Sequence, residues 1–95
     1  MNLSILNTIT KIPEAYSEGT YNNRKYGITK SSFNKGKSFK VYGEELGGND
    51  LVSFNYYVTK GENLIKPCEV PKHKVVHFLE NVILNHIKKE ANEQL

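Results

Sequence analysis

Basic side chains without acidic neighbours gather in the first half of this 95-residue chain. Residues 19–43 contain six of them and no aspartate or glutamate: Arg24, Lys25, Lys30, Lys35, Lys37 and Lys40. Strand alternation predicts one polar sheet face with Lys25, Thr29, Lys40, Tyr42, Asn55 and Tyr57. Lysines neutralise phosphates and tyrosine rings stack on bases, so this face predicts a site for single-stranded nucleic acid or another anionic ligand. The alternative is a solvated sheet face, where lysine and tyrosine are common neighbours.

The kind of cation limits the kind of nucleic acid. Arg24 is the only arginine, and arginine forms bidentate contacts to base edges that lysine cannot form. We therefore expect no reading of base sequence in a duplex. The abundance of lysine and asparagine is typical of AT-rich coding sequence, which predicts a small bacterial or phage protein.

Cys68, His73 and His77 are the residues that could bind a metal or carry redox chemistry. The histidines are four apart and would share one helix face, as in the H-x-x-x-H helix of zinc peptidases. Lys74 stands where the catalytic glutamate of that helix would be, and a fourth ligand is not evident. Exposed histidines and a small buried cysteine are the simpler interpretation. We predict no metal, no cofactor and no catalytic residue.

Two other kinds of ligand loop are not supported. The acidic, glycine-containing segment 44–50 lacks the alternating oxygen ligands of an EF-hand, and a turn explains its glycines. The phosphate-binding patterns G-x-x-x-x-G-K-[ST] and G-x-G-x-x-G do not occur.

The elements that would position these residues form a single domain over residues 1–95. No apolar run approaches the ~18 residues that span a bilayer, and residues 1–9 lack the pattern of a signal peptide. The single cysteine excludes an internal disulfide. We therefore expect a cytoplasmic protein without membrane contact.

Helices are expected at both ends of the chain. Apolar residues at helical spacing precede Pro13, which should end a short first helix: Leu3, Ile5, Leu6, Ile9 and Ile12. A second apolar stripe follows Pro71 and predicts a long C-terminal helix: Val75, Leu79, Val82, Ile83 and Ile87.

Alternating segments and turn signals fill the region from about residue 17 to 70. The turns are expected at Asn22-Asn23, Lys35-Gly36-Lys37, Gly47-Gly48-Asn49-Asp50 and Lys60-Gly61-Glu62-Asn63. Val52, Phe54, Tyr56 and Val58 alternate with Ser53, Asn55, Tyr57 and Thr59. The predicted fold is α+β: an antiparallel meander of three to four strands, with the short N-terminal and long C-terminal helices packed on one face.

The stretch from about residue 21 to 84 resembles the meander-plus-helix plan of the positive-cofactor-four transcriptional coactivators and their small bacterial relatives. The resemblance lies in the order of elements and in Arg24-Lys25-Tyr26-Gly27-Ile28-Thr29 followed by Lys35-Gly36-Lys37. It implies a homodimer that binds single-stranded DNA on its strands without strict sequence reading. The N-terminal helix and Lys66-Pro67-Cys68-Glu69 depart from that plan.

A second resemblance covers nearly the whole chain. It rests on Gly36-Lys37-Ser38-Phe39-Lys40-Val41-Tyr42, Glu45-Leu46-Gly47-Gly48, Phe54-Asn55-Tyr56-Tyr57 and Lys66-Pro67-Cys68-Glu69. These segments are similar to small bacterial proteins, some of which carry a peptide methionine sulfoxide reductase label. The glycine-cysteine-phenylalanine-tryptophan motif of that reductase class is absent, and the chain has no tryptophan.

The leading hypothesis from the sequence is a non-enzymatic binding module for single-stranded nucleic acid, acting as a homodimer. The six cations would neutralise phosphates, and Tyr42 and Tyr57 would stack on bases. A second hypothesis is a phage-encoded protein that sequesters a small nucleotide-like anion, with Lys40, Tyr42, Asn55 and Tyr57 as polar anchors. A third is a protein-interaction subunit that acts through a sheet edge or the C-terminal helix.

Overall fold

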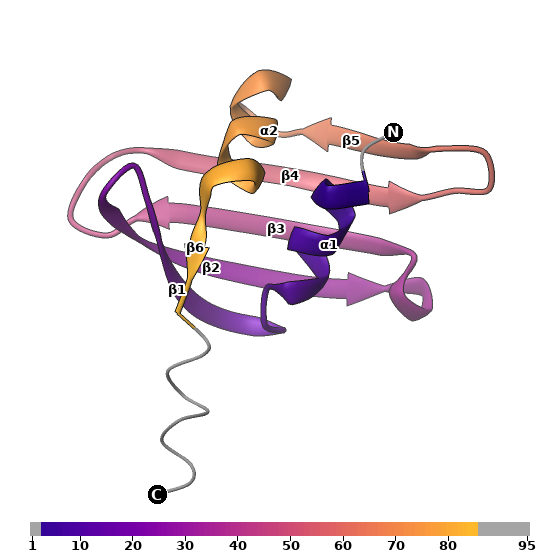
Figure 1. Cartoon of the computed structure of the whole chain (residues 1–95), viewed down its shortest axis with the longest axis horizontal. Coiled ribbons are helices and arrows are strands. Elements are labelled where there is room, and N and C mark those ends of the chain that lie inside the picture. Colours follow the sequence, from indigo (N-terminus) through magenta and orange to yellow (C-terminus); the bar gives the residue numbers. More distant parts are fainter. Residues whose placement is uncertain (1–2, 86–95) are drawn as a thin grey trace, which may run out of the picture.

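The computed structural model describes residues 3–85, and this part of the chain forms a six-stranded antiparallel sheet with two helices against one side (Figure 1). In chain order the elements are α1 (Leu3–Lys11), β1 (Ala15–Tyr21), β2 (Arg24–Phe33), the 3-10 turn η1 (Asn34–Gly36), β3 (Ser38–Glu45), β4 (Leu51–Val58), β5 (Asn63–Pro67), α2 (Lys72–Asn81) and β6 (Ile83–Leu84). The strand order is β5-β4-β3-β2-β1-β6. The α+β class and the antiparallel meander are confirmed, whereas three to four strands was too few.

The short N-terminal helix is confirmed. α1 ends at Lys11, two residues before Pro13, and its buried residues Ile5 and Ile9 recur at helical spacing. Neither helix between residues 3 and 85 has the length and apolar character needed to cross a bilayer.

Strict alternation along the strands separates a covered face from an open one, as predicted. The covered face and the helices form one core, whose fully buried members include Tyr26, Ile28, Val41, Val52, Phe54, Val75 and Phe78. All four predicted turns connect successive strands from β1 to β5, and Asn22 and Asn23 take positive φ angles of 54° and 63°. The open face is where the predicted binding residues must be sought.

The prediction of a long C-terminal helix is wrong. α2 ends at Asn81, Val82 is extended with φ −71° and ψ 140°, and β6 pairs with Gly19 and Thr20 of β1. The β-branched residues Val82 and Ile83 favour an extended chain where a sheet edge offers hydrogen bonds. The apolar residues from 75 to 83 therefore belong to two elements, the core face of α2 and the edge strand β6. Ile87, the last residue of the predicted stripe, lies outside the described residues.

Gly19 permits the close approach of β6 to the sheet. A Cβ atom added at Gly19 would lie 2.8 Å from the carbonyl oxygen of Ile83, which is shorter than real Cβ contacts. The absence of a side chain at this position therefore determines whether the chain can return to the edge of β1.

We expect Gly19→Ala to lower the free energy of unfolding by about 1–3 kcal/mol, because the methyl group must displace β6 or strain β1. Urea unfolding followed by circular dichroism measures the loss. The matched control is Gly61→Ala in the β4–β5 turn, where an added Cβ meets no atom within 4 Å. Equal stability of the two variants would show that the contact between Gly19 and β6 does not limit packing.

Candidate functional site

The register of the strands gathers lysine and tyrosine residues in neighbouring rows of the open face. The central row is Ser31, Lys40, Asn55 and Lys66, read across β2 to β5. One flanking row is Phe33, Ser38, Tyr57 and Leu64, and the other is Tyr16, Thr29, Tyr42 and Ser53. Lys40 therefore lies between two rows that each carry aromatic rings. Tyr42 and Tyr57 are about 13 Å apart along the strands, as expected for a four-residue separation.

The aromatic rings of these rows are exposed. Phe33 is 52%, Tyr42 39% and Tyr57 37% exposed, and Leu64 in the same row as Tyr57 is 39% exposed. Most of the large exposed hydrophobic side chains within residues 3–85 thus lie on one sheet face. Apolar groups gathered on a face that no helix covers are typical of a binding surface.

The turn η1 adds cations at the Phe33 end of this face. Lys35 and Lys37 are exposed, and Lys35 has a positive φ of 56°. The carbonyl of Lys37 accepts a hydrogen bond from the Val58 backbone N–H at 2.8 Å, which fixes the turn against β4. Both side chains therefore extend from a backbone that is anchored to the sheet.

The opposite end of the open face is acidic. Glu18, Gly27 and Glu44 form the row beyond Tyr16 and Tyr42. Lys25 is on the open face but lies beyond this acidic row, about 20 Å from the Lys40 row along β2. The structure thus separates Lys25 from the other open-face cations.

Arg24 and Lys30 belong to the covered face instead. The Arg24 guanidinium pairs with Glu45 at 2.9 Å, and Lys30 is 6% exposed with its Nζ donating to the Ile9 carbonyl of α1 at 3.0 Å. Burial lowers the pKa of Lys30. Both positions are an even number of residues from Tyr26, so strict alternation applied along the whole of β2 would have placed them correctly.

Cys68 does not join the histidines. Its backbone N–H donates to the Ser53 carbonyl at 2.9 Å, and its sulfur lies 3.8 Å from the Asn55 amide nitrogen. Within residues 3–85, no three His, Cys, Asp or Glu side chains are placed to hold a metal ion.

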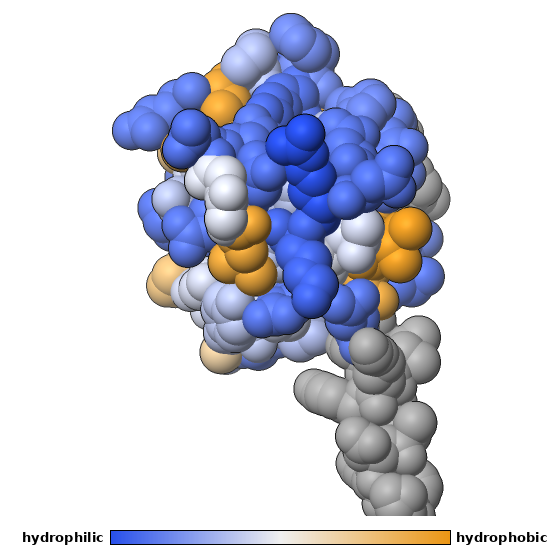
Figure 2. All heavy atoms as spheres, turned by 90° about the vertical axis from the view of Figure 1, so that its left-hand side faces the viewer, coloured by the Kyte–Doolittle hydropathy of each residue, from blue (hydrophilic) through white to orange (hydrophobic). Residues whose placement is uncertain are grey.

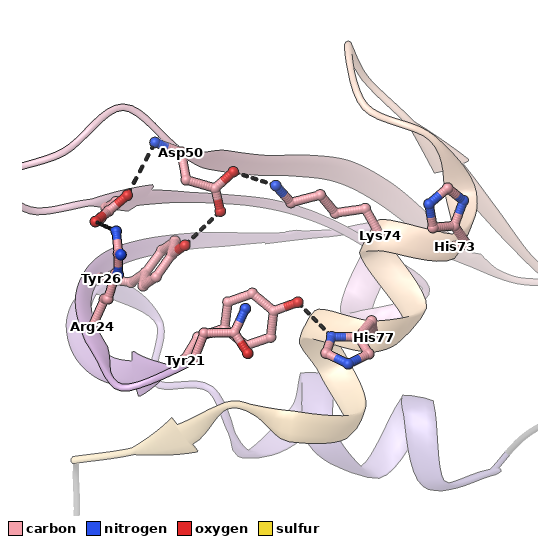
Figure 3. Close-up of a pocket in the computed structure, with 9 residues that line it drawn as sticks. Tyr21, Arg24, Tyr26, Asp50, His73, Lys74 and His77 are labelled. Carbon is pink, nitrogen blue, oxygen red and sulfur yellow. Dashed lines mark hydrogen bonds and ion pairs between the residues drawn. The ribbon is translucent and has the colours of Figure 1, made fainter.

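A recess that the sequence patterns did not reveal opens at the end of the molecule near the β1–β2 and β3–β4 turns (Figure 3). Its volume is about 500 Å³, and its lining residues are Tyr21, Asn22, Arg24, Tyr26, Glu45, Asp50, His73, Lys74 and His77. This end of the molecule is largely hydrophilic, with only isolated hydrophobic side chains (Figure 2). The lining comes from β1, β2 and the turn between them, from β3 and the β3–β4 turn, and from α2, so no single sequence segment signals it.

Asp50 is the centre of the polar network in this recess. Its carboxylate accepts hydrogen bonds from the Tyr26 hydroxyl at 2.5 Å and from the Lys74 ammonium group. Its backbone N–H donates to Glu45 Oε1 at 3.3 Å, and Glu45 Oε2 accepts from Arg24. One turn residue therefore links β2, β3 and α2. The only sequence signals for this were the carboxylates flanking the glycine turn and the spacing of His73, Lys74 and His77.

The surroundings of Tyr26 and Asp50 determine which of the two groups carries the proton. Burial would raise the pKa of Asp50, but the Lys74 ammonium and the Tyr26 hydroxyl outweigh it and hold that pKa below its usual value. Burial and the neighbouring Asp50 carboxylate raise the pKa of Tyr26. The proton therefore stays on Tyr26 while Asp50 stays ionised, which suits a binding or structural role better than proton transfer.

Tyr21 orients His77. The Tyr21 oxygen lies 2.6 Å from His77 Nδ1, and burial raises the pKa of Tyr21. A neutral Tyr21 hydroxyl donates to Nδ1 or accepts from it according to the imidazole tautomer. In both tautomers this contact fixes the orientation of the His77 ring.

Comparison of the chain with protein-family profiles, curated proteins and solved structures finds no match.

We expect Asp50→Asn to flatten the acid side of the stability profile. Because the folded-state pKa of Asp50 is lowered, its contribution is present above its unfolded pKa of about 4 and is lost as the pH falls through the folded value. Urea unfolding between about pH 7 and pH 3 should show a steeper decline for the wild type than for the variant. Glu62→Gln, in the exposed β4–β5 turn, is the control and should keep the wild-type profile. A parallel decline for Asp50→Asn and the wild type would contradict the assigned role.

Proposed function

We propose that this protein is a non-enzymatic module that binds single-stranded nucleic acid on its open sheet face. The observation that supports this most directly is the cross-strand row containing Lys40 and Lys66, which lies between exposed aromatic residues of the two flanking rows. Cations beside flat, exposed rings match a phosphate backbone with unstacked bases.

The proposed binding surface, called the lysine–aromatic surface below, joins the central row, the η1-side row and Tyr42 of the other flanking row to the turn. Its members are Phe33, Lys35, Lys37, Lys40, Tyr42, Asn55, Tyr57 and Lys66. Arg24, Lys25 and Lys30 are left out because the first is paired, the second lies beyond the acidic row and the third is buried. Lys66 was absent from the predicted set and enters because it is opposite Asn55.

The mechanism is neutralisation of phosphates combined with stacking of bases. The four lysines of the surface would each approach a phosphate, and the rings would stack on two or three bases, as aromatic residues do on other small open sheets. Asn55 between Lys40 and Lys66 offers an amide that can both donate and accept. The bound nucleic-acid strand would run away from Glu18 and Glu44, because these carboxylates repel phosphate.

We expect Lys37→Glu with Lys40→Glu to abolish binding while the fold is kept, since both side chains are exposed. Fluorescence anisotropy with a labelled mixed-sequence single strand measures this at several salt concentrations. For the wild type, four phosphate contacts predict a slope of log affinity against log salt of about −3. The control is Lys11→Glu with Lys72→Glu, which makes the same change in net charge on the helix-covered side. Equal loss in both double variants would reduce the effect to net charge and overturn the proposed surface.

We also expect Tyr42→Leu with Tyr57→Leu to weaken binding by ~1–3 kcal/mol for each base stack lost, because leucine keeps the apolar contact but not the flat ring. The same anisotropy assay gives the affinity. Tyr16→Leu is the matched control, an exposed tyrosine of the same face that lies beside Glu18. If Tyr16→Leu lowers the binding affinity as much as the double variant does, stacking is not localised as proposed.

A further inference from the structure

The recess around Asp50 is separate from the lysine–aromatic surface. Arg24 and Tyr26 face the helix side of β2, whereas Lys25 and Thr29 face the open side. We propose that the recess is a second binding site, for a small organic phosphate of about nucleotide size. The proposal does not depend on nucleic-acid binding by the open face.

The size of the recess favours a small organic molecule over a single inorganic ion. A volume of about 500 Å³ lies within the range of about 300–1,000 Å³ that small-molecule sites occupy. A phosphate group alone would leave most of it to water. The recess is open to solvent and not an enclosed cavity, so a ligand can enter without unfolding any element.

Unused hydrogen-bond donors decide the chemical class of the ligand. Every carboxylate oxygen in the recess already accepts a bond: Asp50 from Tyr26 and Lys74, and Glu45 from Arg24 and the Asp50 backbone. In the described part of the chain, by contrast, Arg24 uses one of its five N–H groups and Lys74 one of its three. More unused capacity is thus on the donors than on the carboxylates, and two of the donor groups are cationic.

The formal charges in the recess do not by themselves select an anion. Arg24 and Lys74 are balanced by Glu45 and Asp50. Selection comes instead from the unused donors of Arg24 and Lys74, which are cationic, whereas each carboxylate oxygen already accepts one hydrogen bond. A phosphate, with several acceptor oxygens and a negative charge, fits Arg24 as a fork and Lys74 as a point charge.

The beginning of α2 adds further donors. His73 and Lys74 lie in the first turn of this helix and His77 one turn later, and all three side chains line the recess (Figure 3). The first turn contains no acidic residue, and Pro71 at the N-cap provides no side-chain hydrogen bond. The positive end of the helix is therefore left without a negative partner on its own helix, which favours an anion nearby.

Two rings form a preorganised wall for the rest of the ligand. Tyr21 is 4% and Tyr26 2% exposed, and the rings pack edge to face with centroids 5.5 Å apart. Tyr21 also packs against His77 at 5.6 Å and holds it by the 2.6 Å hydrogen bond. The wall is thus fixed before a ligand arrives, and ordering it on binding costs little.

The test is a titration of the ¹⁵N-labelled full chain with ADP and, separately, with inorganic phosphate, followed by amide chemical shifts. We expect ADP to shift the amides of Arg24, Asp50, Lys74 and His77, and to bind more tightly than inorganic phosphate. Arg24→Ala with His73→Ala should weaken ADP binding about tenfold or more, because it removes the guanidinium assigned to the phosphate and a second polar side chain of the recess lining. Both side chains are exposed, so the fold should be kept, and thermal melting of the variant checks this.

Lys25→Ala with Lys72→Ala is the matched control. Each of these lysines is the sequence neighbour of an altered residue, and neither lines the recess. Unchanged ADP affinity in this control, with loss in the recess variant, supports the site. ADP shifts on the lysine–aromatic surface, equal losses in both double variants, or no shifts at millimolar ADP would each overturn it. Nucleic-acid binding by the recess variant should equal that of the wild type, so the two proposals fail independently.

Discussion

The fold depends on the fact that both helices pack against the same side of the sheet. Most alternate residues of the central strands are therefore apolar on that side, and the other side is left to solvent or a ligand (Figure 1). Lys30 is a charged exception on the covered side. Its position in β2 turns it inward, where its ammonium group donates to the Ile9 carbonyl near the end of α1 and lies 5.4 Å from the centre of the Phe39 ring. A cation at a helix C-terminus is stabilising, so the inward lysine connects α1 to the sheet.

The two ends of the core are held by different chemistry. At the α1 end, apolar side chains pack together and Lys30 donates to the Ile9 carbonyl, whereas at the other end Asp50 joins β2, the β3–β4 turn and α2 through polar groups. Polar anchoring suits a turn, because its backbone groups must be satisfied outside the sheet ladder. The recess lies beside this network, and Asp50 is among its lining residues.

The sequence was sufficient where a local rule decided the outcome. Alternation fixed the two faces of β3 and β4, and asparagine or glycine marked each turn. It was insufficient where the outcome depended on contacts between distant segments. Ile83 fits a helical stripe as well as a strand, and only the position of Gly19 in β1 lets it pair there. Asp50 lies 24 residues from Tyr26 and 24 from Lys74, so the meeting of these three residues is a property of the topology.

The basic segment that first suggested nucleic-acid binding therefore serves two sides of the molecule. Adjacent residues of β2 have opposite surroundings: Arg24 pairs with Glu45 on the covered side, and Lys25 is exposed on the open side. Counting cations along the sequence overstates the charge of the open face, because Arg24 and Lys30 are engaged elsewhere. It also misses Lys66, which β5 adds beside Asn55. The number of lysines near the exposed rings, set by strand register, is what determines the strength and salt dependence of any nucleic-acid binding there.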